Sequence, residues 1–267
     1  MSDRILVLRT PSGISGDMLL AGMARIAGQD DRGLAELVGR LALEALHGCL
    51  SVDQVKIDGI TGWKASINLP HEHVHRSCSD IRALIRASEL SSRAKDLAES
   101  VFAELAKAEG AIHGKSADEV TFHEVGALDS ILDICLVSAM FDRISPDRFV
   151  CSPLPVCDGI IRCEHGLHSA PAPAVLHMLN AIPVYGIDSI GETITPTAIA
   201  LLKVLGATFD RWPPLTVEKV ERIFGGRIIP NVPNGAVFVL GISHGLEYCA
   251  GPGDVPQHYV AVRGCKD

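Results

Sequence analysis

Apolar residues recur along the chain with two different periods, and these periods predict its strands and helices. The apolar run from Ile5 to Leu8 predicts a short buried strand over 4–8, and the apolar stretch after the next loop predicts a helix over 18–26. Residues 50–69 read as two strands that turn at Asp58-Gly59, a typical hairpin signal. The same patterns predict further helices over about 32–46, 92–110, 127–144, 172–180 and 195–206, and further strands within 147–163, 214–224 and 235–242.

The order of these elements indicates the fold class. Strands that occur singly between helices in some stretches and as hairpins in others predict an α/β protein with a mixed sheet and flanking helices, in one unit or two subdomains. Ser79 is expected to cap a short helix, and Thr195 to cap the helix that opens with Pro196. We expect the domain to span residues 1–244, followed by a tail over 245–267 whose turn-forming residues favour little fixed structure.

Composition and charge narrow the function classes. The chain has 47% hydrophobic and 21% charged residues and a formal net charge of −8, which argues against nonspecific binding to nucleic acid. The sequence shows neither a signal-peptide core nor an apolar run long enough to span a membrane, so we expect a cytoplasmic protein. Its eight cysteines should then be reduced, and without a C-x-x-C pair they do not predict a zinc ribbon.

The stretch HEHVHRSC, residues 71–78, is the first candidate metal site. In an extended segment His71, His73 and His75 would share one face, because side chains alternate between the two sides of a strand. Together with Cys78 they offer nitrogen and sulfur donors, which suit nickel, copper or zinc rather than magnesium or calcium. The alternative is a solvated polar loop.

The glycine-containing segment SGISGD, residues 12–17, precedes the first predicted helix. Gly13 and Gly16 would let backbone N–H groups approach a phosphate at the helix N-terminus. No lysine follows the second glycine, so the segment is not a Walker A loop. The alternative is a tight turn in which Asp17 stabilises the start of the helix.

A third group of polar residues surrounds the start of the helix predicted over 127–144. His123 and Glu124 precede this helix, and Asp129 and Asp133 lie one turn apart on one face of it. The two carboxylates are candidates for binding a cation. Alternatively, Asp129 simply complements the positive N-terminus of the helix.

Taken together, six segments in this order and at these intervals resemble the LarC family, the pyridinium-3,5-bisthiocarboxylic acid mononucleotide nickel insertion proteins. The resemblance covers roughly residues 4–242. The six segments are SGISGDM (12–18), HEHVHRSCSDI (71–81), FHEVGALDSILDI (122–134), CSPLPV (151–156), HGLHSAPAPA (165–174) and GETITPT (191–197).

The resemblance implies an activity and a role for each candidate site. A LarC-type cyclometallase of the lyase class inserts Ni²⁺ into pyridinium-3,5-bisthiocarboxylate mononucleotide and so produces the nickel-pincer nucleotide cofactor of lactate racemase. Read in this way, His71, His73, His75 and Cys78 collect nickel, and Ser12, Gly13, Gly16 and Asp17 bind the phosphate end of the nucleotide. His123 and Glu124 serve the metal path or take the proton from the ring carbon that becomes metallated.

The resemblance also implies partners. The family is CTP-dependent with a divalent metal, Mg²⁺ or Mn²⁺, bound by a C-terminal nucleotide-binding domain. Because this sequence stops shortly after Pro233-Asn234, we expect that domain to be absent here; either a separate polypeptide supplies it, or this protein has a narrower function. Lactate racemase apoprotein would receive the product. The alternatives are a nickel-binding, storage or regulatory paralogue without chemistry of its own and, more remotely, a phosphate-ester enzyme.

Overall fold

The computed structural model describes residues 2–69, 76–122, 127–163, 166–189, 191–229 and 232–243. Several predictions fall outside these ranges: the roles of His71, His73, His75, His123 and Glu124, and the tail over 245–267.

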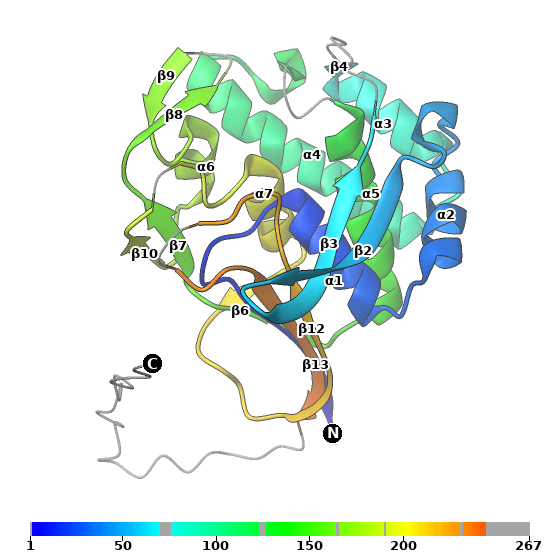
Figure 1. Ribbon diagram of the computed structural model, residues 1–267. Coiled ribbons are helices and arrows are strands. Elements are labelled where there is room, and N and C mark those ends of the chain that lie inside the picture. Colours follow the sequence, from blue (N-terminus) through cyan, green and yellow to red (C-terminus); the bar gives the residue numbers. More distant parts are fainter. Residues whose placement is uncertain are drawn as a thin grey trace.

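A seven-stranded mixed sheet forms the base of the fold (Figure 1). Strand β1 is central: it pairs antiparallel with β13, with Leu6 opposite Leu240, and parallel with β6. The mixed sheet with flanking helices confirms the predicted fold class. In spatial order the strands are β11 (Thr208–Phe209), β6 (Arg148–Cys151), β1 (Asp3–Arg9), β13 (Ala236–Ser243), β12 (Thr216–Ile223), β3 (Ile60–Ile67) and β2 (Leu50–Ile57).

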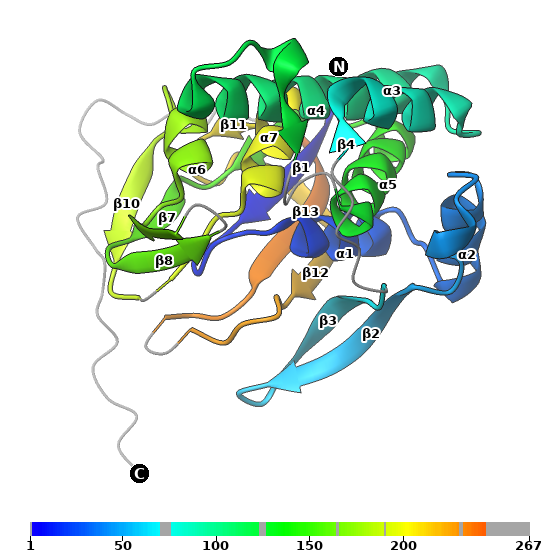
Figure 2. The ribbon, with the colours of Figure 1, turned by 90° about the horizontal axis from the view of Figure 1, so that it is seen from above.

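The helices gather on one face of this sheet (Figure 2). Side chains along β1 alternate between the two faces of the sheet. Leu6 and Leu8 point into the main core with the helices, whereas Ile5 and Val7 belong to a small cluster on the opposite face. Helix α1 packs directly on the sheet, against β3, β12 and β13. The helices are α1 (Gly16–Ile26), α2 (Asp31–Gly39), α3 (Cys78–Ala87), α4 (Ser92–His113), α5 (Leu128–Ile144), α6 (Pro173–Met178) and α7 (Pro196–Val204).

Local chemistry explains where the elements begin and end. Asp58 and Gly59 have φ values of +50° and +79°, the left-handed pair that a tight hairpin turn requires, which confirms the predicted hairpin. The Thr195 hydroxyl accepts a hydrogen bond from the Ala198 N–H, which confirms it as a cap. The helix predicted over 32–46 is shorter than expected, because α2 ends at Gly39 and a separate 3₁₀ turn spans Glu44–Leu46.

The cap predicted at Ser79 is wrong by two residues. Ser77 caps α3 instead, because its hydroxyl accepts from the Asp80 N–H at 3.2 Å while the Asp80 carboxylate accepts from the Ser77 N–H at 2.9 Å. This reciprocal pair satisfies two N–H groups that would otherwise lack partners, which a lone hydroxyl at Ser79 cannot do.

Short strands outside the main sheet were mostly missed by the periodicity. Two or four residues are too few to show an alternating pattern, and their pairing depends on distant partners. These strands are β4 (Arg76–Ser77) with β5 (Thr121–Phe122), β7 (Leu154–Cys157) with β10 (Val184–Ile187), and β8 (Ile160–Cys163) with β9 (Gly166–Ser169).

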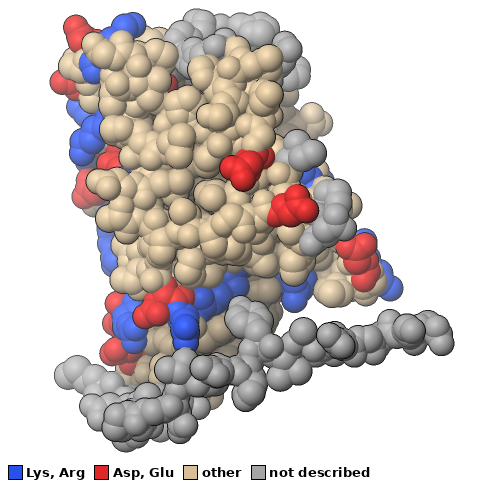
Figure 3. All heavy atoms as spheres, turned by 90° about the vertical axis from the view of Figure 1, so that its left-hand side faces the viewer, with Lys and Arg blue, Asp and Glu red and all other residues tan. Residues whose placement is uncertain are grey.

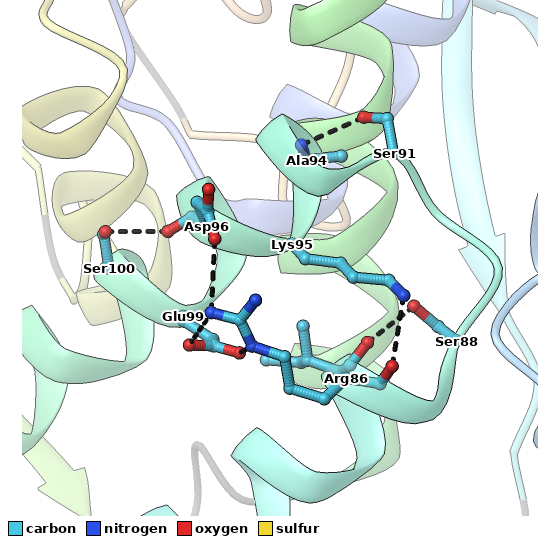
Figure 4. A network of polar contacts seen from close by, with 9 residues as sticks. Arg86, Ser88, Ser91, Ala94, Lys95, Asp96, Glu99 and Ser100 are labelled. Carbon is cyan, nitrogen blue, oxygen red and sulfur yellow. Dashed lines mark hydrogen bonds and ion pairs between the residues drawn. The ribbon is translucent and has the colours of Figure 1, made fainter.

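A polar network on the surface ties α3 to α4 (Figure 4). The Arg86 guanidinium donates to Asp96 at 3.2 Å and to Glu99 at 2.8 Å, and the Lys95 ammonium donates to the Arg86 carbonyl at 3.1 Å. Ser91 caps α4 by accepting from the Ala94 N–H. The network therefore orients α3, which follows directly on β4.

One face of the molecule carries few charged side chains (Figure 3). It lies over β8, β9, β10 and α6. Several large apolar side chains there are exposed: Ile160, Leu167, Leu176, Val184 and Tyr185. Within the described ranges, no helix combines the length and the apolar composition needed to cross a lipid bilayer.

Candidate functional site

The loop between β1 and α1 is held against a second loop that precedes α7. The Ile14 N–H donates to the Thr193 carbonyl at 2.8 Å, and the Thr195 N–H donates to the Ile14 carbonyl at 3.2 Å. This short parallel bridge brings the N-termini of α1 and α7 together, although 180 residues of sequence separate Ile14 from Ile194.

Both glycines of the first loop are explained by close contacts within the protein. Gly13 has a φ of +108°, and a Cβ at this position would lie 1.9 Å from the Thr193 carbonyl oxygen. At Gly16 a Cβ would lie 2.4 Å from Oδ2 of Asp133. The backbone contact and the positive φ require glycine at position 13, whereas at position 16 a Cβ would displace the Asp133 carboxyl. The predicted binding of phosphate by Ser12, Gly13, Gly16 and Asp17 stays a prediction.

Three helix N-termini converge on one cavity of about 690 Å³. Such a volume lies within the range of small-molecule sites. The positive ends of three helix dipoles meet there. The lining comprises Ser15, Gly16 and Asp17 at the start of α1, Ala127–Ser130 and Asp133 of α5, Thr195 and Thr197 at α7, and Ala65, Ile67, Asn68 and Leu69 at the end of β3.

Three carboxylates line this cavity, and they differ in burial. Asp129 is exposed and accepts from the Ser130 N–H, while Asp17 is half-buried and accepts from the Ser15 hydroxyl. Asp133 is only 8% exposed, and its Oδ1 has no hydrogen-bond partner among the described residues. Burial raises the pKa of the Asp133 carboxyl well above its ordinary value, and the nearby charges of Asp17 and Asp129 raise this pKa further.

A smaller cavity of about 260 Å³ adjoins the first, with Ser15, Asp17 and Thr195 lining both. Its wall combines the loop around Gly13 with residues of the segments 224–229 and 234–235. The side chain of Asn234 links these two segments: it accepts a hydrogen bond from the Ile229 N–H at 2.8 Å and donates one to the Ile229 carbonyl at 2.9 Å. Arg227 and Glu192 contribute the remaining charges to the lining.

The structure describes the residues on either side of the two histidine-containing segments, 70–75 and 123–126, and these flanking residues lie close together. Strands β4 and β5 pair antiparallel, so that Arg76, which follows the first segment, lies opposite Phe122, which precedes the second. At their other ends, Leu69 and Ala127 both line the larger cavity. The structure thus brings together the flanks of the candidate groups that the sequence placed about 50 residues apart.

Cys78 is the one predicted metal ligand that the structure describes. It opens α3 and lines a small hollow with Arg82, Glu99 and Phe102, away from the lining of the larger cavity. Burial raises the pKa of the Cys78 thiol, and Arg82 opposes this rise. A metal would therefore have to displace the proton of a thiol that burial keeps neutral, and the role of Cys78 as a ligand stays a prediction.

In the part of the chain that the structure describes, no three His, Cys, Asp or Glu side chains gather closely enough to hold a metal ion. The acidic residues of the larger cavity are thus not a preformed metal centre. The cation site that the sequence left open at Asp129 and Asp133 stays a prediction, as does the alternative in which Asp129 complements the start of α5.

Sequence reasoning singled out Ser12, Gly13 and Asp17 of the smaller cavity but missed the residues that line it from the distant segment. Arg227 and Asn234 lie far along the chain from Gly13, and no local pattern connects them. The only local signal is the pair Gly225-Gly226, which indicates a turn before Arg227. The sequence placed the Asp133 carboxylate on the same helix face as Asp129, but the burial of Asp133 could not be predicted from helical spacing.

The fold and the site define a mixed α/β protein with an acidic ligand cavity at three helix N-termini. The chain belongs to the nickel insertion protein family: the family model described as nickel insertion protein matches residues 6–257. This confirms the resemblance seen in the six sequence motifs.

Curated relatives agree with this assignment. A protein of Desulfitobacterium hafniense (strain DSM 10664 / DCB-2) named pyridinium-3,5-bisthiocarboxylic acid mononucleotide nickel insertion protein is 38% identical over 209 residues, which cover 78% of this chain and 51% of the relative. A protein of Geotalea daltonii named "Putative nickel insertion protein" is 34% identical over 238 residues, which cover 89% of this chain and 61% of the relative. The matched region thus spans between half and two thirds of each relative's length. No solved structure matches the chain.

Proposed function

We propose that this protein inserts nickel into pyridinium-3,5-bisthiocarboxylic acid mononucleotide, the substrate named for its Desulfitobacterium relative. The observation that carries the proposal is the cavity of about 690 Å³ at the three helix N-termini, because residues flanking both histidine-containing segments line it. Its size suits a mononucleotide. The product would be the nickel-pincer nucleotide, with lactate racemase apoprotein as its recipient.

The two adjoining cavities suit the two ends of such a substrate. The phosphate would lie in the smaller cavity, which Arg227, Ser12 and Gly13 line, with Gly16 at the adjoining edge of the larger cavity. The pyridinium ring and the incoming Ni²⁺ would lie in the larger cavity, where carboxylates favour positive charge. Asp17 lines both cavities, and its carboxylate is better matched to the cationic end than to the phosphate.

Nickel is the cargo of this reaction, and it must be captured and then released. Imidazoles suit that task, because nickel binds them well and several weak contacts can be surrendered one at a time. We assign capture to His71, His73 and His75, with Cys78 as an additional ligand. His123 and Glu124 would lie on the path from these residues to the cavity.

We assign CTP and its Mg²⁺ or Mn²⁺ to the family's C-terminal nucleotide-binding domain and to none of the described residues. The CTP requirement and a separate polypeptide carrying the nucleotide-binding domain stay predictions, which the assay below addresses with its own arms.

Calorimetry with Ni²⁺ tests the capture site. The parent chain should bind about one equivalent of nickel, and replacing His71, His73 and His75 together by alanine should abolish that binding. The matched control replaces three exposed histidines elsewhere: His47, His113 and His177. If the first triple variant binds nickel as the parent does, the assignment of the capturing ligands is wrong.

Activation of lactate racemase apoprotein tests the reaction itself. The chain is incubated with the bisthiocarboxylate mononucleotide and Ni²⁺, with and without CTP and Mg²⁺ or Mn²⁺, and with and without a polypeptide that carries the C-terminal nucleotide-binding domain. The full-length Desulfitobacterium relative serves as the positive control. Activation by this chain in any arm supports the proposal. Activation by the relative alone would leave this chain as a nickel-binding protein without chemistry.

A further inference from the structure

The nickel insertion proposed above includes a proton transfer that needs an acceptor. When the ring carbon between the two thiocarboxylates is metallated, its C–H bond breaks and the bonding electron pair forms the C–Ni bond. The proton must leave to a base, so that one Ni²⁺ replaces one H⁺ with no change of oxidation state. A positioned side chain accelerates such a step by about 10²–10⁴-fold.

Asp133 is the side chain of the larger cavity that is best suited to accept this proton. It lies in the second turn of α5, is 92% buried, and has an Oδ1 without a hydrogen-bond partner among the described residues. A buried carboxyl oxygen without a hydrogen-bond partner costs free energy, and a ligand bound in the cavity would offset this cost. Among the described residues that line the cavity, there is no Lys or Arg that could compensate it.

The fold makes room for this carboxyl at the start of α1. Its Oδ2 lies 2.4 Å from the position that a Cβ of residue 16 would occupy, so only glycine there permits the approach. The Asp133 carboxyl therefore lies against the first turn of α1 and lines the cavity where the substrate ring would lie. Gly16 thus positions Asp133, a role distinct from the phosphate contact that the sequence suggested.

We propose that Asp133 is the catalytic base of nickel insertion and accepts the proton of the ring carbon as the C–Ni bond forms. The inference rests on the proposed function and assigns to Asp133 the proton-accepting role for which the sequence offered His123 and Glu124. Neither of the other carboxylates fits as well: Asp129 is exposed and Asp17 is only half-buried, and both accept hydrogen bonds already.

The electrostatic surroundings agree with this role. The charged groups that act on Asp133 are Asp17 from α1 and Asp129 from its own helix, while α7 contributes Thr197 and the end of β3 contributes Asn68. Burial and the two carboxylates raise the pKa of Asp133, which makes its anion a stronger base than an exposed aspartate. Entry of Ni²⁺ adds positive charge and favours the anion before the proton is transferred.

Three variants of the full chain test the proposal: Asp133→Asn, Asp133→Glu and, as a matched control, Asp142→Asn near the opposite end of α5. The rate of product formation is measured from pH 5 to 9 with ordinary substrate and with substrate deuterated at the reacting carbon, and nickel binding is measured by calorimetry. We expect Asp133→Asn to lower the rate at least about 100-fold and to remove the pH dependence that Asp133 imposes, with nickel binding unchanged. Asp133→Glu should recover part of the rate, and Asp142→Asn should match the parent.

The outcomes separate this inference from the proposed function. An active parent together with an Asp133→Asn variant within threefold of its rate would overturn the role of Asp133 alone. Loss of rate with an unchanged pH profile and no recovery in Asp133→Glu would also overturn it, because it would indicate a structural effect. A parent that inserts no nickel while the full-length relative does would overturn the proposed function and this inference together.

Discussion

Replacing Gly13 by alanine is the sharpest test of how the site is built. Gly13 has a φ of +108°, a region that residues with a Cβ rarely adopt, and the added methyl would lie 1.9 Å from the Thr193 carbonyl oxygen. The backbone strain costs about 1–3 kcal/mol. The overlap costs about 1–3 kcal/mol more, because both the loop and its partner must move. The expected loss is thus about 2–6 kcal/mol, a large share of the 5–15 kcal/mol that stabilises a typical domain.

Gly28→Ala is the matched control. Gly28 also has a positive φ, +71°, but nothing lies within 4 Å of the position its Cβ would take. This variant therefore suffers the backbone strain alone, at roughly 1 kcal/mol. The difference between the two variants reports the contact between the loop around Gly13 and Thr193, together with any additional backbone strain at the larger φ of Gly13.

Urea unfolding and thermal melts of the two variants and the parent measure this difference. Since 1 kcal/mol corresponds to roughly 2–4 °C in Tm for large domains, Gly13→Ala should melt at least about 4 °C below the parent and clearly below Gly28→Ala. If Gly13→Ala is as stable as Gly28→Ala, the packing explanation for Gly13 is wrong, and the glycine would have to be explained by a ligand.

Three further predictions concern stability. The folded-state pKa of Asp133 lies above its pKa in the unfolded chain, so the parent should lose stability as the pH rises from about 4 towards the folded-state pKa. Asp133→Asn should remove this loss. Unfolding curves should therefore show the variant to be more stable than the parent at pH 7 but not at pH 3. Thr195→Ala removes the cap of α7 and should cost about 1 kcal/mol in urea unfolding, whereas Thr195→Ser should cost little. Arg86→Ala breaks a largely exposed contact with Asp96 and a contact with Glu99, whose side chain is only 15% exposed. Because the Arg86 side chain is itself 53% exposed, the effect on Tm should be small and should fade in high salt; a large, salt-independent loss would contradict this view of the α3–α4 network.

Local sequence patterns were sufficient to predict most of the long helices and strands. The hairpin at Asp58-Gly59 and the cap at Thr195 follow from turn and capping chemistry within four or five residues, and the structure confirms both. The short pair β4–β5 could not be predicted in this way. Its partners lie 46 residues apart at Arg76 and Phe122, and two-residue strands form only because the surrounding helices hold them in place.

The candidate site shows the same division. The sequence by itself determined the family, the residue types of the metal-handling segments, and the two glycines before the first helix, because these depend on order and spacing along the chain. Only the tertiary structure decided that α1, α5 and α7 begin at one cavity, that Gly16 makes room for Asp133, and that Arg227 joins the loop around Gly13. The physical reason is that burial and charge proximity arise from contacts between distant segments, and these two effects convert an ordinary aspartate on α5 into a candidate base.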